Sequence, residues 1–115
     1  MCHPPLIARN PQREIDEAPY IPFDQDARLQ QIIDENRNVI FISGHTHISP
    51  TVEFDSSHGN LYINDGSICP TTAKDENDKI QQGNVTLLEI SKNEIAVTVK
   101  GIHTEVVLFS DTYIF

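Results

Sequence analysis

The sequence predicts an α/β fold, and within this chain an α+β arrangement of one short helix followed by mostly antiparallel strands. Three observations support this class. A single stretch, residues 24–38, carries apolar residues at helical spacing. Several short apolar or alternating runs rich in β-branched residues follow it. Turn-forming residues separate these runs at short intervals, which is typical of hairpins.

Composition limits the size and the partners of the protein. At 115 residues the chain is long enough for one domain with a modest core. Its formal charge is −9, from 8 Lys and Arg against 17 Asp and Glu. Binding to a nucleic-acid backbone needs a basic face, so this balance argues against that function and against docking on anionic membranes. No apolar run approaches the roughly 18 residues that a membrane-spanning helix needs.

Localisation signals are absent from the sequence as given. The start, MCHPPLIARN, has neither the basic n-region nor the apolar h-region of a signal peptide. Two cysteines, Cys2 and Cys69, are too few for a disulfide framework. We therefore expect reduced, mainly buried thiols in a cytoplasmic protein, with a single bridge as the alternative.

The N-terminal third is predicted to form a long loop, a helix and a strand. Residues 3–26 hold five of the seven prolines and show little periodicity, which indicates a loop. Leu29, Ile32 and Ile33 then repeat at helical spacing, and Asp24 or Asp26 offers an N-cap. The continuous apolar run of residues 39–42 predicts a strand that is buried on both faces.

The rest of the chain is predicted to form two hairpins and a last strand. Residues 51–54 and 61–65 flank the turn sequence DSSHG. Residues 84–90 and 94–102 alternate around a Ser-Lys-Asn turn. Residues 105–109 add a strand, and the charged residues 70–83 form an exposed loop. The chain is thus a mostly antiparallel layer with one helix.

Three histidines could hold a metal. His45 and His47 follow the buried strand with one residue between them, so on an extended chain both point to one side. Gly44 before them permits a sharp turn. His3 precedes two prolines that fix its backbone direction, which makes it a third ligand candidate. The alternative interpretation is that these histidines are exposed polar residues at a strand end.

Two of these stretches resemble motifs of the calcineurin-like metallophosphoesterases. Residues 1–6, MCHPPL, resemble the late histidine motif of that family, and residues 44–47, GHTH, resemble its final Gly-His-x-His motif after an apolar strand. The resemblance implies that His3 and His45 ligate one metal and His47 the other. The strands that follow are similar to the second sheet half of the family's β-sandwich.

The earlier motifs of that family do not occur in this sequence. The resemblance implies Asp-x-His, Gly-Asp and Gly-Asn-His motifs, but both Gly-Asn pairs are followed by other residues, Leu61 and Val85. A catalytic motif rarely begins a reading frame. We therefore expect residues 1–115 to be the C-terminal portion of a single catalytic domain, with the upstream portion missing.

The expected function is hydrolysis of a small phosphate ester, a monoester or a diester, by the intact enzyme. Two divalent cations (Mn, Fe or Zn), which the resemblance implies, would lower the pKa of a bound water and neutralise charge on the phosphoryl oxygens. The three histidines bring no bridging carboxylate, so the isolated chain should hold at most one cation and be inactive. No residue of this chain is assigned to catalysis, and Tyr20 and Phe23 are candidates only for lining a substrate pocket.

A second interpretation comes from a different class of protein. The chain would then be a small acidic, β-rich interaction or regulatory module whose histidines have no catalytic role. His58 in a turn and His103 in a strand are expected to be ordinary solvated or cross-strand residues. Under the enzyme interpretation, an apolar sheet face that packed on the missing portion would be uncovered, so we expect self-association as a homodimer.

Overall fold

The computed structural model describes residues 2–11, 21–46, 50–65, 83–102 and 105–115. Within these ranges the chain forms one α-helix, one short 3-10 helix and six strands in two three-stranded sheets. Strand pairing is mostly antiparallel, which confirms the predicted α+β arrangement. The chain divides into two units, residues 1–46 with 51–64 and residues 47–50 with 65–115.

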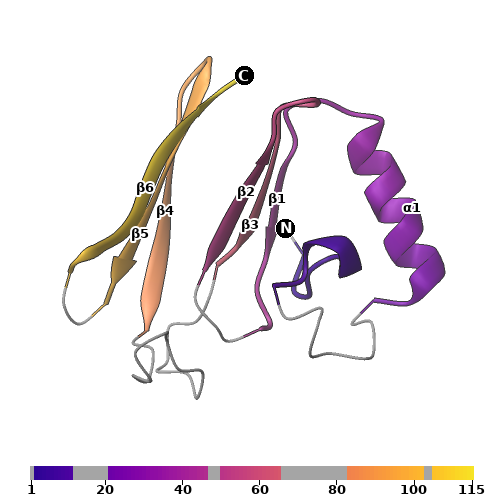
Figure 1. Ribbon diagram of the computed structural model, residues 1–115, viewed down its shortest axis with the longest axis horizontal. Coiled ribbons are helices and arrows are strands. Elements are labelled where there is room, and N and C mark those ends of the chain that lie inside the picture. Colours follow the sequence, from indigo (N-terminus) through magenta and orange to yellow (C-terminus); the bar gives the residue numbers. More distant parts are fainter. Residues whose placement is uncertain (1, 12–20, 47–49, 66–82, 103–104) are drawn as a thin grey trace. The chain divides into compact units, whose positions relative to one another are not determined.

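The first unit is built on the sheet β1-β3-β2 (Figure 1). Strands β2 (Thr51–Asp55) and β3 (Asn60–Asn64) form the predicted antiparallel hairpin. Strand β1 (Ile40–Ser43) pairs in parallel with β3, so both strands end at the same edge of the sheet. The central strand β3 is buried along its whole length.

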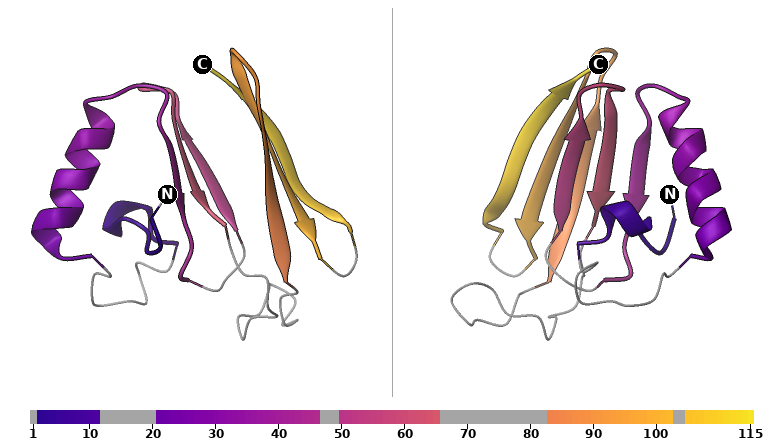
Figure 2. Two further views of the ribbon diagram at one scale, coloured as in Figure 1. Left: turned by 180° about the vertical axis from the view of Figure 1, so that it is seen from behind. Right: turned by 45° about the vertical axis from the view of Figure 1, so that its right-hand side comes forward.

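The helix α1 (Phe23–Asp34) and the 3-10 helix η1 (Ile7–Arg9) cover one face of this sheet (Figures 1 and 2). The core between them contains Leu6, Ile33, Phe41 and Tyr62. Leu6 is fully buried, so the proline-rich segment is anchored directly on the sheet. Burial of such apolar side chains is the main stabilising contribution in a unit of this size.

Two details of the predicted elements were wrong. Pro22, rather than Asp24 or Asp26, occupies the N-cap of α1, and it makes no side-chain capping bond. Strand β1 is buried on one face only, since Phe41 is buried whereas its neighbour Ile42 is half-buried. The strand that is buried along its whole length is β3, the central strand of the sheet.

The second unit is the antiparallel sheet β4-β5-β6. Strands β4 (Asn84–Ile90) and β5 (Glu94–Gly101) form the second predicted hairpin, and alternate residues of β5 are buried. Strand β6 (Val107–Ile114) begins two residues later than the predicted last strand and continues almost to the end of the chain. Of the predicted polar loop, residues 70–82 lie outside the described ranges. No helix in the described part is long and apolar enough to cross a membrane.

Candidate metal centre

The backbone turns sharply just after β1, at the first histidine of the GHTH motif. His45 has a φ of 70°, which lies in the left-handed region that non-glycine residues rarely occupy. The sequence placed the turn at Gly44, but the positive φ falls on the histidine itself. Such a conformation costs about 1 kcal/mol or more and persists only where neighbouring contacts hold it. Strained residues of this kind are frequent at functional sites.

Three side chains, Ser43, Thr46 and Asn64, hold this turn, and we call them the loop clamp. Thr46 Oγ1 donates to Asn64 Oδ1 at 2.8 Å. Asn64 Nδ2 donates to the Gly44 carbonyl at 3.0 Å and to Ser43 Oγ at 3.4 Å. All three side chains are buried, so each bond also satisfies a group that would otherwise be desolvated without a partner. The loop clamp therefore fixes the residues on both sides of His45.

The segment that carries His3 lies against the end of β1. The Cys2 N–H donates to the Ile42 carbonyl, and the Gly44 N–H donates to the His3 carbonyl, each at 2.8 Å. These two bonds make the segment run in the same direction as β1. Next along the chain, Pro5 is fully buried. His3 is therefore positioned by backbone bonds on one side and by an anchored proline on the other.

The structure brings His3 and His45 together, although they are 42 positions apart in the sequence. Their ring nitrogens, His3 Nε2 and His45 Nδ1, are 3.0 Å apart, and the rings meet edge to face with centroids at 4.9 Å. One nitrogen carries a hydrogen and the other accepts it. Two nitrogens that share a cation at about 2.1 Å lie about 3.0–3.4 Å apart for angles of about 90–110°. Both side chains are exposed, so the pair fits a cation that approaches from solvent.

Several of the other candidate residues lie outside the part of the chain that the structure describes. His47, the third predicted ligand, lies outside the described residues, as do His103 and Cys69. Among the described residues, no group of three or more His, Cys, Asp or Glu could hold a metal ion, and His47 was not part of that set. Cys2 is a free, half-buried thiol that packs against the core of the first unit. The assignment of His3, His45 and His47 as ligands stays a prediction.

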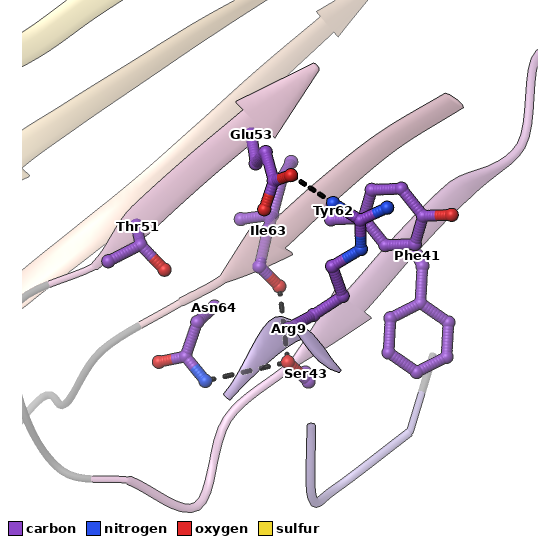
Figure 3. Close-up of a pocket in the computed structure, with 8 residues that line it drawn as sticks. All are labelled: Arg9, Phe41, Ser43, Thr51, Glu53, Tyr62, Ile63 and Asn64. Atoms are coloured by element: carbon purple, nitrogen blue, oxygen red, sulfur yellow. Dashed lines mark hydrogen bonds and ion pairs between the residues drawn. The ribbon is translucent and has the colours of Figure 1, made fainter. Parts of the chain in front are cut away.

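A small pocket on the helix-covered face of the sheet borders the loop clamp (Figure 3). The guanidinium of Arg9 lies over the Tyr62 ring, 4.1 Å from its centroid, and forms an ion pair with Glu53. Ser43 and Asn64 line the pocket and also belong to the loop clamp. No sequence signal pointed to Arg9 and Glu53, because the two residues are 44 positions apart. Phe23, a candidate for a substrate pocket, is instead exposed at the start of α1, and Tyr20 lies outside the described residues.

His58 belongs to a separate group of polar side chains in the β2–β3 turn. His58 Nδ1 lies 2.7 Å from Asp55 Oδ2 and 2.7 Å from Ser57 Oγ, and that hydroxyl lies 2.5 Å from Asp55 Oδ1. Hydrogen bonds from Ser57, and next from His58, hold the pKa of Asp55 well below its usual range. A Ser-His-Asp triad needs the two ring nitrogens to contact different partners. Here Ser57 and Asp55 both contact Nδ1, so the cluster stabilises the turn and is not arranged for nucleophilic catalysis.

Comparisons with known proteins add no assignment. No protein-family model matches the chain, and no curated protein matches it either. The candidate metal centre is therefore supported by its own residues and their geometry.

Proposed function

We propose that this chain carries histidine ligands of a metal-dependent hydrolase that acts on phosphate esters, with the other ligands contributed by sequence beyond these 115 residues. The observation that supports this most strongly is the 3.0 Å approach of His3 Nε2 to His45 Nδ1. The two residues belong to the two stretches that resemble metallophosphoesterase motifs. A resemblance in sequence and a convergence in space are independent arguments for one site.

In this proposal the protein's contribution is to orient neutral imidazoles at a solvent-accessible edge. His3 and His45 would hold one cation, and His47 would reach a second. Divalent cations bound there would supply Lewis acidity toward a phosphoryl oxygen and activate a water molecule. The loop clamp fixes the backbone of His45 before a cation arrives, which reduces the ordering that binding requires. The substrate is a small phosphate ester, and no side chain of this chain is assigned to direct attack.

Metal titration of purified variants tests this proposal. Zinc binding, measured by competition with a chromogenic chelator, should be lost or weakened at least about tenfold in His3→Ala and in His45→Ala. His58→Ala is the matched control, because His58 lies in the same unit but is paired with Asp55. Equal zinc affinity in the His45→Ala and wild-type chains would contradict the proposal.

A second candidate function is an acidic interaction module without catalysis. The observation that favours it is the row of exposed apolar side chains along β6, together with the formal charge of −9. The genomic sequence upstream separates the two proposals. Asp-x-His, Gly-Asp and Gly-Asn-His motifs in frame before Met1 would support the hydrolase, and a different upstream domain or none would support the module.

A further inference from the structure

Strand β1 lies at one side of the first sheet, and its outer edge, which faces away from β3, is occupied only at its end. Within the described residues β1 pairs with one strand, β3. At the end of β1 the Cys2 N–H donates to the Ile42 carbonyl, and the Gly44 N–H donates to the His3 carbonyl. Both bonds join β1 to a segment that runs in the same direction. The outer edge of β1 therefore already holds the last residues of a parallel neighbour.

The register of β1 on β3 shows which other backbone groups face this outer edge. Ile40 lies opposite Leu61, whose N–H donates to the Val39 carbonyl. In a parallel ladder each residue bonds to the two neighbours of the residue opposite it, so alternate residues of β1 bond to β3. Ile40 and Ile42 therefore face outward, as the bond from Cys2 requires. The Ile42 N–H and both backbone groups of Ile40 have no hydrogen bond to another residue in the described ranges.

The position of α1 indicates a strand on the same side. The helix lies toward the outer edge of β1 rather than over β2 (Figures 1 and 2). On one flank of the helix, Gln30 donates to the Tyr62 hydroxyl of β3 at 3.3 Å. Ile32 lies about 160° from Gln30 around the helix, on the flank away from β3, and is 43% exposed. The helix thus carries apolar surface beyond the edge of the sheet, where a strand beside β1 would lie.

The order of the elements also fits a strand in this place. The chain leaves the outer edge of β1 at His3, passes through η1 and α1, and enters β1 in the same direction. Neighbouring parallel strands need a crossover of this kind, usually with a helix on one face of the sheet. Cys2 and His3, then α1, then β1 correspond to the end of the first strand, the crossover and the second strand of a β-α-β unit.

We infer that the residues directly upstream of Met1 form a strand parallel to β1 and complete this β-α-β unit. The inference rests on the proposed function, which places further ligands outside these 115 residues, and it identifies the segment that joins the two parts. Bonded residues alternate along a strand. Because Cys2 donates to Ile42, the residue directly before Met1 donates to the Ile40 carbonyl and accepts from the Ile42 N–H. The third residue before Met1 accepts from the Ile40 N–H.

The direction of the existing bonds favours this segment over a second copy of the chain. A two-fold axis that joins two identical strand edges makes the strands antiparallel. Cys2 and His3 instead run parallel to β1 and occupy the end of the edge in each copy. A segment that is continuous with Cys2 extends the ladder in the direction in which it has begun.

Hydrogen exchange of the full chain, followed by NMR, tests the inference. About six residues of the natural upstream sequence are added before Met1. The Ile40 and Ile42 amides should then exchange at least about tenfold more slowly than in the 115-residue chain. Proline directly before Met1 removes the N–H that bonds to Ile40 and should restore faster exchange. Met1→Pro in the extended chain is the matched control, because that position faces away from β1 in the inferred ladder, and slow exchange should persist.

The amides of β5 are the internal reference for folding, because β5 belongs to the second unit and should exchange equally in all variants. Unchanged exchange of Ile40 and Ile42 in a folded extended chain would overturn the inference, as would a natural reading frame that begins at Met1. Slow exchange that develops in the 115-residue chain as its concentration rises would assign the edge to a second copy and overturn it too. The proposed function is tested separately, by zinc binding in His45→Ala.

Discussion

At the scale of single residues, the most informative feature is Asn64. Its amide bonds to the residues on both sides of His45, so Asn64→Ala removes the centre of the loop clamp. We expect a loss of about 1–3 kcal/mol in the free energy of unfolding, because buried partners are left unpaired. Zinc affinity should fall by about 10- to 100-fold, as for other residues that support a ligand. Chemical denaturation and chelator competition measure the two effects.

The control for that substitution is Asn36→Ala. Asn36 is exposed, and its side chain donates to the Ile32 carbonyl at the end of the helix. Zinc affinity should be unchanged in this variant. If Asn64→Ala bound zinc as tightly as Asn36→Ala, the loop clamp would have no part in positioning His45.

Asp55 gives a pH-dependent prediction at the same scale. Its pKa is lowered in the folded chain, first by Ser57 and next by His58, so the folded state favours the carboxylate. The resulting stabilisation is fully present above the ordinary aspartate pKa of about 3.9 and is lost as pH falls below that value. Carboxyl NMR should show that the pKa of Asp55 lies below the ordinary aspartate value of about 3.9. Ser57→Ala should raise the Asp55 pKa more than His58→Ala does, and a wild-type midpoint near the ordinary value would contradict the assignment.

Residue by residue, the candidate site was only partly predictable from the sequence. The proximity of His3 and His45 was expected, because two motifs in chain order pointed to the end of one strand. The positive φ of His45 and the loop clamp were not, since they depend on Asn64, which enters through the pairing of β1 with β3. The local spacing of the histidines carries no information about Asn64, which lies 18 positions beyond its partner Thr46.

At the scale of elements, the helix N-terminus gives a further prediction. Asp26 is buried and accepts a hydrogen bond from the Ile7 N–H at 2.9 Å, so it joins α1 to η1. Asp26→Ala leaves that N–H without its partner and should lower the free energy of unfolding by about 1–3 kcal/mol. Asp24→Ala, at an exposed position of the same turn, should change it by less than about 0.5 kcal/mol. Equal effects in thermal denaturation would show that the bond does not anchor the proline-rich segment.

The elements themselves were largely predictable, because their patterns are local. Helical spacing identified α1, and turn residues identified both hairpins. The errors occurred where a contact between residues far apart in the sequence determines the structure. Asp26 was predicted as a possible cap of the helix but bonds to Ile7 instead, and the strand that is buried along its whole length is the central strand β3. Strand order is a property of pairing between segments, which periodicity within one segment does not contain.

At the scale of the whole molecule, the described part of the chain offers imidazoles but no carboxylate at the candidate site. Within that part, no third His, Cys, Asp or Glu completes a metal-binding group with His3 and His45. Neutral ligands alone do not offset the charge of two neighbouring cations, so the isolated chain should bind one zinc or nickel ion at most. Binding should weaken as pH falls through the imidazole range, because protons compete for the ring nitrogens. Two strong sites in calorimetric titration at several pH values would contradict this prediction.

The purified 115-residue chain should also be catalytically inactive. Hydrolysis of a generic aryl phosphate with added manganese should stay at background, because in-line displacement at phosphorus by two metals needs both cations and the groups that bridge them. His45→Ala should abolish the binding of the single zinc or nickel ion, and His58→Ala should leave it unchanged. Under the proposed function, supplying an upstream portion that carries the other ligands in trans should restore turnover only with intact His3 and His45. Robust turnover by the chain alone, surviving both His45→Ala and His47→Ala, would mean that the histidines have another role and that the chemistry lies elsewhere in the molecule.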